Sequence, residues 1–452
     1  MTGHGNYSHP TITSTSTRAI IVHPILSKGI AGDESRARLE EACGLATAIH
    51  LDIMHAETVS VPKPRPSTLL SKGLVERFEG CVAELEVVVV IINHTLSPGQ
   101  QRTLERAWKT KVIDRTGLIL EIFGERARTR EGQLQVELAH LTYQRSRLVR
   151  SWTHLERQRG GSGFLGGPGE TQIEIDRRLI SERITYIKKD LKKVTRTRNL
   201  HRSARKRIPY PIVAFVGYTN AGKSTLFNNL TSAGVFAEDQ LFATLDPTMR
   251  GLKLPSGRKI ILSDTVGFVS DLPHELVAAF GATLEEVLEA DVLVHVRDIS
   301  HSETEEQKKD VDDVLARMGV GPLADTKRNA QQYIEAHNKV DLLDEVTRGQ
   351  VERRVRKASQ VVMLSGLTGE GINDLLLMID KLISSGRCVL DVAIPFADGK
   401  TLAWLYRKGE VVARDDGEVE TKLTVMLDPA DVVRLESKQN TRILVRSPDY
   451  NG

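Results

Sequence analysis

Residues 217–224 read G-Y-T-N-A-G-K-S and stand between an apolar run, residues 212–216, and a stretch of helical character that starts near Thr225. In such a loop the glycines let the backbone curl, so that successive N–H groups and the N-terminus of the helix point at phosphate oxygens. Lys223 adds a positive charge, and Ser224 adds a hydroxyl that suits Mg²⁺. The order of strand, loop and helix therefore predicts an α/β fold with a nucleotide-phosphate site.

A second motif, Asn338-Lys339-Val340-Asp341, follows a short apolar stretch further along the chain. A carboxylate in the position of Asp341 accepts two hydrogen bonds from the N1–H and 2-amino groups of guanine, which adenine does not offer. We expect Asn338 to brace the loop and contact the base, and the stem of Lys339 to cover the ring face. The string N-K-x-D is common by itself, and its place behind the phosphate loop is what points to guanine.

Two further phosphate elements stand in the order that a GTPase needs. Asp264-Thr265-Val266-Gly267 follows a strand-like run, so that Asp264 is expected to reach Mg²⁺ through water while the Gly267 amide faces a γ-phosphate. Between this element and the phosphate loop lies Phe242-Ala243-Thr244-Leu245-Asp246, whose Thr244 is placed to ligate the same ion and order a switch loop. Thr248 is the alternative ligand.

A fifth element, Ser365-Gly366-Leu367, follows strand-like residues 361–364 and is expected to present backbone amides to the guanine oxygen. The five elements in this order predict an enzyme that binds GTP and GDP and hydrolyses GTP, with Mg²⁺ held by Ser224 and Thr244. The residues expected to contact the nucleotide are Gly217, Tyr218, Thr219, Asn220, Ala221, Gly222, Lys223, Ser224, Phe242, Ala243, Thr244, Leu245, Asp246, Asp264, Thr265, Val266, Gly267, Asn338, Lys339, Val340, Asp341, Ser365, Gly366 and Leu367.

The residue after Gly267 is Phe268, where many Ras-like switches carry a glutamine that orients the attacking water. An apolar ring cannot polarise water, so we expect slow intrinsic hydrolysis, and the catalytic group stays unassigned. Asn220 has two interpretations. The pattern G-x-x-N-x-G-K-S resembles that of potassium-activated GTPases, in which case Asn220 holds K⁺ near the β- and γ-phosphates; otherwise Asn220 only shapes the loop.

The remaining sequence has the composition of a soluble globular protein. The 452 residues leave room for about three domains. Cys43, Cys81 and Cys388 lie far apart without metal-ligand spacing, which argues against disulfides and zinc and favours a reducing, cytoplasmic location. No apolar run approaches the roughly 20 residues of a membrane span, so we expect no integral membrane contact. The Ser/Thr-rich residues 1–18 are expected to form a disordered tail.

Residues 19–125 alternate short apolar runs with helical stretches. Residues 87–92 are apolar on both faces, as expected for a central parallel strand that helices cover on each side. Ser97 or Pro98 opens a helix that continues to about Trp108, and residues 112–114 read as the next strand. These patterns predict a small N-terminal α/β domain.

Residues 126–207 carry apolar side chains at spacings of three and four. They predict two amphipathic helices that pack as an antiparallel coiled-coil hairpin, with the Gly-rich residues 160–169 and Phe164 at its tip. The two apolar stripes consist of Leu134, Leu138, Leu141, Leu148, Trp152 and Leu155, and of Ile173, Ile180, Ile184, Ile187, Leu191 and Val194.

The second of these helices is strongly basic. Residues 177–207 contain thirteen Lys/Arg and two acidic residues, a net charge of +11, although the whole chain carries only +3. A solvated helix face usually mixes both signs, whereas a segregated positive charge favours a polyanion. Nucleic acid suits a cytoplasmic protein better than a membrane surface, and a Gly-rich tip with one aromatic ring suits folded RNA.

Residues 208–386 are expected to form a Ras-like GTPase domain, and residues 387–452 a small C-terminal α/β domain. In the latter, residues 389–394 and 420–426 read as strands, and residues 399–406 and 428–435 read as helices. The expected fold class is thus α/β throughout, with an N-terminal α/β domain, a helical hairpin, a P-loop GTPase domain and a C-terminal α/β appendage.

Several longer runs resemble HflX, a family of bacterial GTPases associated with translation. Residues 167–178, G-P-G-E-T-Q-I-E-I-D-R-R, are similar to its hairpin signature, and residues 135–141, Q-V-E-L-A-H-L, to that of its first helix. Residues 93–105, N-H-T-L-S-P-G-Q-Q-R-T-L-E, resemble the N-terminal motif, while L-F-A-T-L-D-P-T and D-T-V-G-F match the switch regions. The tip sequence F-L-G-G and Met249, where threonine is common, depart from the family pattern.

The resemblance implies a factor that binds the large (50S) ribosomal subunit and its rRNA through residues 126–207, and we expect the protein to be a monomer. It also implies a role in ribosome splitting and rescue or in subunit assembly. ATP use by the N-terminal domain has been associated with the family, but this sequence shows no second phosphate loop. The rival interpretation is a tethering module in which GTP regulates attachment to a membrane or a protein partner; it leaves the basic helix unexplained.

Overall fold

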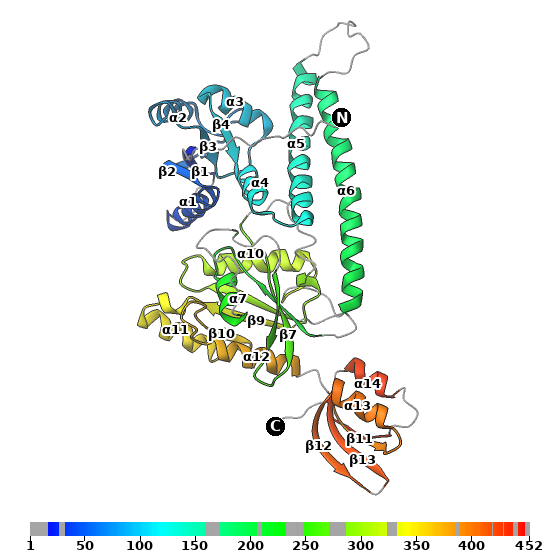
Figure 1. Cartoon of the computed structure of the whole chain (residues 1–452). Coiled ribbons are helices and arrows are strands. Elements are labelled where there is room, and N and C mark those ends of the chain that lie inside the picture. Colours follow the sequence, from blue (N-terminus) through cyan, green and yellow to red (C-terminus); the bar gives the residue numbers. More distant parts are fainter. Residues whose placement is uncertain are drawn as a thin grey trace, which may run out of the picture.

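The computed structural model describes residues 17–26, 32–158, 172–205, 210–231, 242, 248–270, 286–322, 332–384, 388–417, 419–427, 429–436 and 442–447. Three sheets organise these residues, and Figure 1 shows them as separate bodies along the chain, with two long helices beside the first. We call the bodies the N-terminal domain, the central domain and the C-terminal domain, and the two long helices the helical pair. The expected α/β fold class is confirmed.

The N-terminal domain is built on a parallel sheet with strand order β2-β1-β3-β4. Its strands are β1 Thr17–Ile25, β2 Leu51–Ser60, β3 Val89–Ile92 and β4 Lys111–Asp114, and its helices are α1 Gly32–Thr47, α2 Lys72–Glu84, α3 Pro98–Trp108 and α4 Arg115–Arg126. All of β3 is buried, because Val90 and Ile92 pack toward α2 and α3 while Ile91 packs toward α1 and α4. The prediction of a central strand covered on both faces is confirmed.

The helix α3 begins at Pro98, as the sequence predicts, and Ser97 caps it. The Ser97 hydroxyl accepts a hydrogen bond from the Gln100 amide at 3.2 Å, and the Gln100 side chain accepts one from the Ser97 amide at 2.8 Å. This reciprocal pair satisfies two backbone donors that the first helical turn leaves unpaired. Pro98 at the first helical position removes a third donor.

The helical pair consists of α5 Arg130–Gln158 and α6 Gln172–Arg205, which lie side by side in Figure 1. Leu134, Ile184 and Ile187 from the two expected stripes are buried, and Arg183 on α6 pairs with Glu137 on α5 at 2.7 Å. The expected tip, residues 160–169, and the side chains of Trp152, Leu155 and Ile173 lie outside the described residues.

One buried carboxylate attaches α5 to the N-terminal domain. Asp114, at the end of β4, accepts hydrogen bonds from the backbone amides of Leu96 at 3.1 Å and Gly117 at 2.8 Å. The same carboxylate accepts from the Tyr143 hydroxyl and pairs with the Arg147 guanidinium, both on α5. The Asp114 side chain is 0% exposed, so the anchor depends on all four donors rather than on water.

Replacing Asp114 by Asn is expected to lower the free energy of unfolding by about 3 kcal/mol, because it leaves the partly buried Arg147 charge without its counter-ion. Urea titration measures this change. The matched control is Glu121→Gln, which breaks the exposed pair with Lys111 and should shift the unfolding midpoint little. Equal midpoints for Asp114→Asn and the unmodified protein would contradict the anchoring role.

The central domain carries a six-stranded sheet with order β10-β9-β8-β5-β7-β6, in which only β6 runs antiparallel to its neighbour. Helices α7 and α12 cover one face and α10 covers the other. Its elements are β5 Ile212–Val216, α7 Lys223–Thr231, β6 Thr248–Lys253, β7 Lys259–Asp264, β8 Val292–Asp298, α10 Thr304–Arg317, β9 Gln332–Asn338, the short 3-10 helix η1 Val340–Leu342, α11 Glu345–Val355, β10 Val361–Met363 and α12 Ile372–Ser384.

The C-terminal domain is an antiparallel sheet with order β12-β13-β11-β14. Its core joins Leu390 and Val392 of the sheet to Leu405 and Leu435 of the two helices. Its elements are β11 Cys388–Pro395, α13 Gly399–Lys408, β12 Glu410–Asp416, β13 Glu420–Leu427, α14 Pro429–Glu436 and β14 Arg442–Ser447. The expected helices and two of the strands are present, and β12 and β14 extend the sheet beyond the prediction.

The three cysteines are free thiols, as their spacing indicates. Within the described ranges, no helix combines the length and apolar character that crossing a membrane requires.

Candidate functional site

The loop of residues 217–222 connects β5 to α7, as the sequence predicts. Gly217 has a φ of 149° and Gly222 a φ of 90°, which are conformations that other residues rarely adopt. A Cβ atom on Gly217 would lie 2.2 Å from the Val296 carbonyl oxygen, and one on Gly222 would lie 2.2 Å from Nδ2 of Asn338. Only glycine fits at either position, and the resulting curl brings the loop to the N-terminus of α7.

Lys223 lies under this loop rather than in solvent. Its ammonium group donates hydrogen bonds to the carbonyl oxygens of Gly217 at 3.1 Å and Tyr218 at 2.7 Å. Burial lowers the pKa of Lys223 to about 8, although the nearby Asp264 carboxylate opposes the shift. The amine is therefore held in place and is ready to gain a phosphate partner.

The affinity of the loop for a nucleoside diphosphate is expected to fall as the pH rises above about 8. Bound phosphates stabilise the charged lysine and raise its pKa, so the lysine contribution is complete below the pKa of the free protein. Above that pKa the dissociation constant for GDP should rise by up to about tenfold per pH unit. Titrations with GDP at pH 7, 8 and 9 and constant ionic strength measure this.

The control for the pH series is Lys223→Arg, which stays charged throughout the range and should bind with a flatter pH profile even where its affinity is lower. A dissociation constant of the unmodified protein that is constant to pH 9 would contradict the titration of Lys223.

Oxygen ligands suited to Mg²⁺ meet beside the loop. The Ser224 hydroxyl donates to Oδ2 of Asp264 at 2.7 Å, where β7 ends. The next residue is fixed as well, because the Thr265 hydroxyl donates to the Phe215 carbonyl at 2.6 Å. Hard oxygen donors in this arrangement fit Mg²⁺. Thr248, the alternative ligand, begins β6 and lies opposite Asp264 in the strand register. Ala243, Thr244, Leu245 and Asp246 lie outside the described residues.

Asn338 joins the phosphate loop to the last predicted element. Its Nδ2 group donates to the Ala221 carbonyl at 2.7 Å, while its Oδ1 atom accepts from the Gly366 amide at 2.8 Å. The side chain is buried, so these two bonds fix the distance between both elements. The bracing that the sequence suggested for Asn338 is therefore present in the structure.

Lys339 and Asp341, the two charged residues of the same motif, differ in their surroundings. Lys339 pairs with Asp298 at the end of β8, with 2.7 Å between Nζ and Oδ2. Asp341 lies in η1 with an exposed side chain, which leaves its carboxylate accessible to a base. Ser365 is buried, whereas Leu367 on the following turn is 76% exposed. The hydrogen bonds of Asn338 thus hold the phosphate loop, the Asn338 motif and the turn next to one another.

Asn220 adopts a left-handed conformation with φ 58° and an exposed side chain. Asparagine is one of the few residues that tolerate this backbone region. The conformation supports the interpretation in which Asn220 shapes the loop, and it leaves the side chain accessible to a cation.

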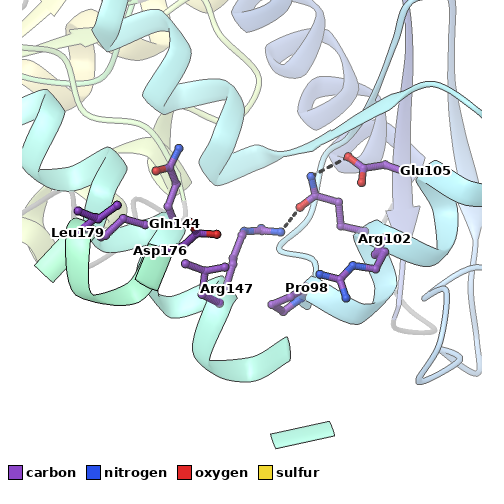
Figure 2. Close-up of a pocket in the computed structure, with 10 residues that line it drawn as sticks. Pro98, Arg102, Glu105, Gln144, Arg147, Asp176 and Leu179 are labelled. Atoms are coloured by element: carbon purple, nitrogen blue, oxygen red, sulfur yellow. Dashed lines mark hydrogen bonds between the residues drawn. The ribbon is translucent and has the colours of Figure 1, made fainter. Parts of the chain in front are cut away.

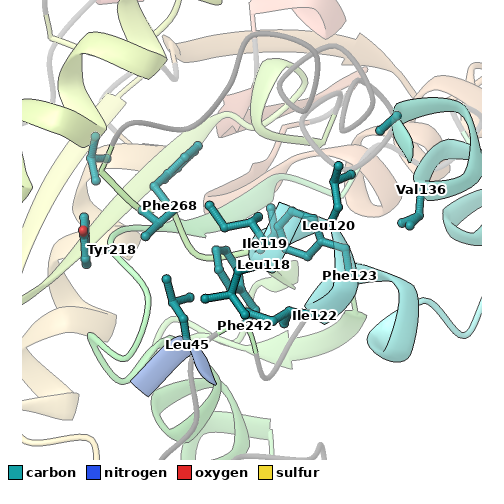
Figure 3. Packing of buried hydrophobic residues seen from close by; sticks show 14 of the residues in the cluster. Leu45, Leu118, Ile119, Leu120, Ile122, Phe123, Val136, Tyr218, Phe242 and Phe268 are labelled. Atoms are coloured by element: carbon teal, nitrogen blue, oxygen red, sulfur yellow. The ribbon is translucent and has the colours of Figure 1, made fainter. Parts of the chain in front are cut away.

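Two switch residues pack against the N-terminal domain, a contact that the sequence patterns do not indicate. Phe242 is 2% exposed and forms an edge-to-face pair with Phe123 of α4, with ring centroids 4.7 Å apart. Phe268 is also 2% exposed and belongs to the same apolar cluster, which Figure 3 shows together with Tyr218. The Phe268 ring therefore fills a core position instead of facing a water molecule.

Comparisons of the chain with known proteins agree with the nucleotide site described above. Four family models match consecutive parts of the chain: GTP-binding GTPase N-terminal at residues 36–124, GTP-binding GTPase Middle Region at 126–205, 50S ribosome-binding GTPase at 212–339, and HflX C-terminal domain at 350–446. The chain is 49% identical to GTPase HflX of Magnetococcus marinus, over 93% of this chain and 95% of that protein. The chain belongs to the HflX family of GTPases.

Further relatives agree with this assignment. The chain is 40% identical to GTPase HflX of Escherichia coli, over 86% of this chain and 88% of that protein. It is 36% identical to Putative GTP-binding protein 6 of Xenopus laevis, over 90% of this chain and 77% of that protein. As a member of the HflX family with a P-loop GTPase fold, the protein is a GTPase.

A second candidate surface is the basic face of α6. Lys188, Lys189, Lys192 and Lys193 all expose their side chains. Beside the helical pair, a cavity of about 540 Å³ opens between α3, α5 and α6, and Figure 2 shows the residues that line it. Its wall is fixed by hydrogen bonds from Arg147 to Gln101 and from Gln101 to Glu105. The cavity is lined by both acidic and basic side chains. The four exposed lysines of α6, in contrast, are all positively charged.

Proposed function

We propose that this HflX-family GTPase binds GTP at the five sequence elements and acts on the large (50S) ribosomal subunit, in ribosome splitting and rescue or in subunit assembly. The observation that carries the proposal is the exposed basic face of α6, on the same chain as a GTPase domain. The match of residues 212–339 to a family described as 50S ribosome-binding GTPase supports it.

At the nucleotide, each element has a separate task. Backbone amides of residues 217–224 and the Lys223 ammonium hold the phosphates, and Asp341 reads the guanine edge, with Asn338 keeping the two regions at a fixed separation. Ser224 and Thr244 would hold Mg²⁺, and Asp264 would reach the ion through water. The ion, when bound, neutralises charge on the phosphate oxygens. Asn220 is the candidate K⁺ ligand, which hydrolysis rates in K⁺ and Na⁺ at equal ionic strength test.

At the ribosome, α6 supplies phosphate contacts to rRNA, and residues 160–169 position the protein. Exposed lysines on a long helix are suited to a phosphate backbone, because each contact releases counter-ions from the RNA. The protein acts as a cytoplasmic monomer, and nucleotide exchange at the central domain regulates its attachment.

Co-sedimentation with purified subunits tests this function. A non-hydrolysable GTP analogue should bring the protein down with 50S subunits more than GDP does, and 50S subunits should stimulate GTP hydrolysis. Binding to 30S subunits should be weaker. The absence of both 50S association and 50S-stimulated hydrolysis would contradict the proposal, and binding to anionic vesicles instead would favour a tethering module.

A further inference from the structure

The hydroxyl of Tyr218 lies where three parts of the molecule meet. Tyr218 follows the first glycine of the phosphate loop, and its hydroxyl accepts a hydrogen bond from the Ser270 amide at 2.8 Å. The Ser270 hydroxyl lies 2.7 Å from the same oxygen. The Tyr218 hydroxyl donates in turn to Glu41 on α1 of the N-terminal domain. One buried oxygen thus bonds the phosphate loop to the segment after Gly267 and to another domain.

Arg115 closes this arrangement from the N-terminal domain. Its guanidinium donates to Glu41 at 2.8 Å, to the Ser270 carbonyl at 3.0 Å and to Oδ1 of Asn93 at 2.7 Å. The side chains of Arg115 and Glu41 are only 8% and 14% exposed, so this ion pair is shielded from solvent. The Ser270 hydroxyl also donates to Asp310 on α10 at 2.7 Å.

The backbone groups of the same segment are also hydrogen-bonded within the protein. The Phe268 amide donates to the Gly217 carbonyl at 3.1 Å, and the Phe268 carbonyl accepts from the Thr219 amide at 2.7 Å. Both backbone groups of Phe268, together with the amide, carbonyl and hydroxyl of Ser270, are therefore occupied by protein partners. As long as these bonds persist, neither the Phe268 amide nor the Ser270 amide is left to donate to a water molecule.

Apolar side chains surround these hydrogen bonds and keep out the water that would compete for their donors and acceptors. Phe242, Phe268 and Val269 are each 2% exposed and lie in the apolar cluster that continues into α4, as Figure 3 shows for the two phenylalanines. Hydrogen bonds in such a setting are stronger than at a surface, and a partner left unpaired is unfavourable.

We propose that Tyr218 is a positioning residue for GTP hydrolysis. Its hydroxyl acts as a latch, because it holds the segment after Gly267, residues 268–270, against Glu41 and Arg115 of the N-terminal domain and thereby restrains turnover. The segment must leave this hydroxyl before its backbone can order the attacking water. Because linkage is reciprocal, the nucleotide that releases the segment also weakens the contact between the domains. This inference concerns basal hydrolysis and is independent of any ribosomal partner.

Tyr218→Phe removes the hydroxyl and keeps the ring in the cluster. The basal kcat is expected to rise roughly tenfold, since the hydrogen bonds that hold the segment weaken. KM and the affinity for GDP should stay within about twofold, because the phosphate loop contacts the nucleotide through its backbone. Glu41→Gln should also raise the basal kcat. The kcat of the double variant should be only slightly above that of the faster single variant, because both substitutions release the same latch.

The matched control is Tyr333→Phe, which deletes another buried tyrosine hydroxyl, bonded to Asp312 and His295 within the central domain. It should leave kcat unchanged, and thermal unfolding of each variant verifies folding. An unchanged or lowered kcat in Tyr218→Phe, a similar rise in Tyr333→Phe, or fully additive effects of Tyr218 and Glu41 would each overturn the proposal.

Discussion

Asp341→Asn is expected to convert a protein that prefers GTP into one that prefers XTP. The carboxylate of Asp341 is exposed on η1 and available to both donors of the guanine edge. An asparagine replaces one acceptor by an N–H donor, which matches the carbonyl that xanthine carries in place of the 2-amino group. Affinity for GTP should fall about a hundredfold, because a hydrogen bond to a charged group is lost and two donors are left face to face.

Competition of GTP and XTP against a fluorescent GDP analogue measures this preference. The matched control is Asp344→Asn, three residues further along the chain. Asp344 caps α11 by accepting hydrogen bonds from the amides of Val346 and Thr347, both at 2.9 Å, and asparagine caps helices equally well. The control should keep the GTP preference. If Asp341→Asn kept it too, another residue would read the base.

The nucleotide site could be predicted from the sequence because its constraints are local. Gly217 and Gly222 are required by backbone angles and close contacts within the loop, and Lys223 and Ser224 follow at fixed spacing. Asn338 lies far along the chain, but the parallel register of β5, β8 and β9 brings the ends of these strands together. Motif order and sheet topology together therefore anticipate the bond from Asn338 to Ala221.

Three of the edge strands were not predicted from the sequence. Among the described residues, β6, β12 and β14 are each the outermost strand of their sheet and pair with a neighbouring strand on one edge alone. β6 has no fully buried residue, so its sequence, T-M-R-G-L-K, lacks the apolar pattern that marks a strand inside a sheet. The pairing with β7 holds it in place, and a short sequence window does not contain that information.

The contact between the N-terminal and central domains was also beyond the sequence patterns. Glu41, Arg115 and Ser270 come from separate parts of the chain, and each looks like an ordinary polar surface residue in its local sequence. Only the folded arrangement brings the Arg115 guanidinium within 3.0 Å of the Ser270 carbonyl. Phe268 illustrates the same limit, because its type excludes a water-orienting role but does not reveal the cluster that it fills.

Reversing the charge of Lys188, Lys189, Lys192 and Lys193 to Glu is expected to weaken binding to 50S subunits by several powers of ten at low salt. All four side chains are exposed on α6, where a phosphate backbone can approach them. Each phosphate contact that is lost should lower the slope of log affinity against log salt concentration by roughly one unit. Co-sedimentation with 50S subunits at several salt concentrations measures both the affinity and the slope.

The control carries the same change of charge on another surface. Four basic residues of the central domain are exposed at the end of α11 and just after it, namely Arg353, Arg354, Arg356 and Lys357. Replacing all four by Glu changes the net charge by the same amount as the α6 variant. If net charge alone governs association, both variants weaken binding alike; if α6 supplies the phosphate contacts, only the α6 variant loses affinity and salt dependence. GDP affinity should stay constant in the α6 variant, since none of its four lysines belongs to the nucleotide elements. Unchanged 50S binding in that variant would remove the RNA-facing role of α6 while leaving the GTPase assignment intact.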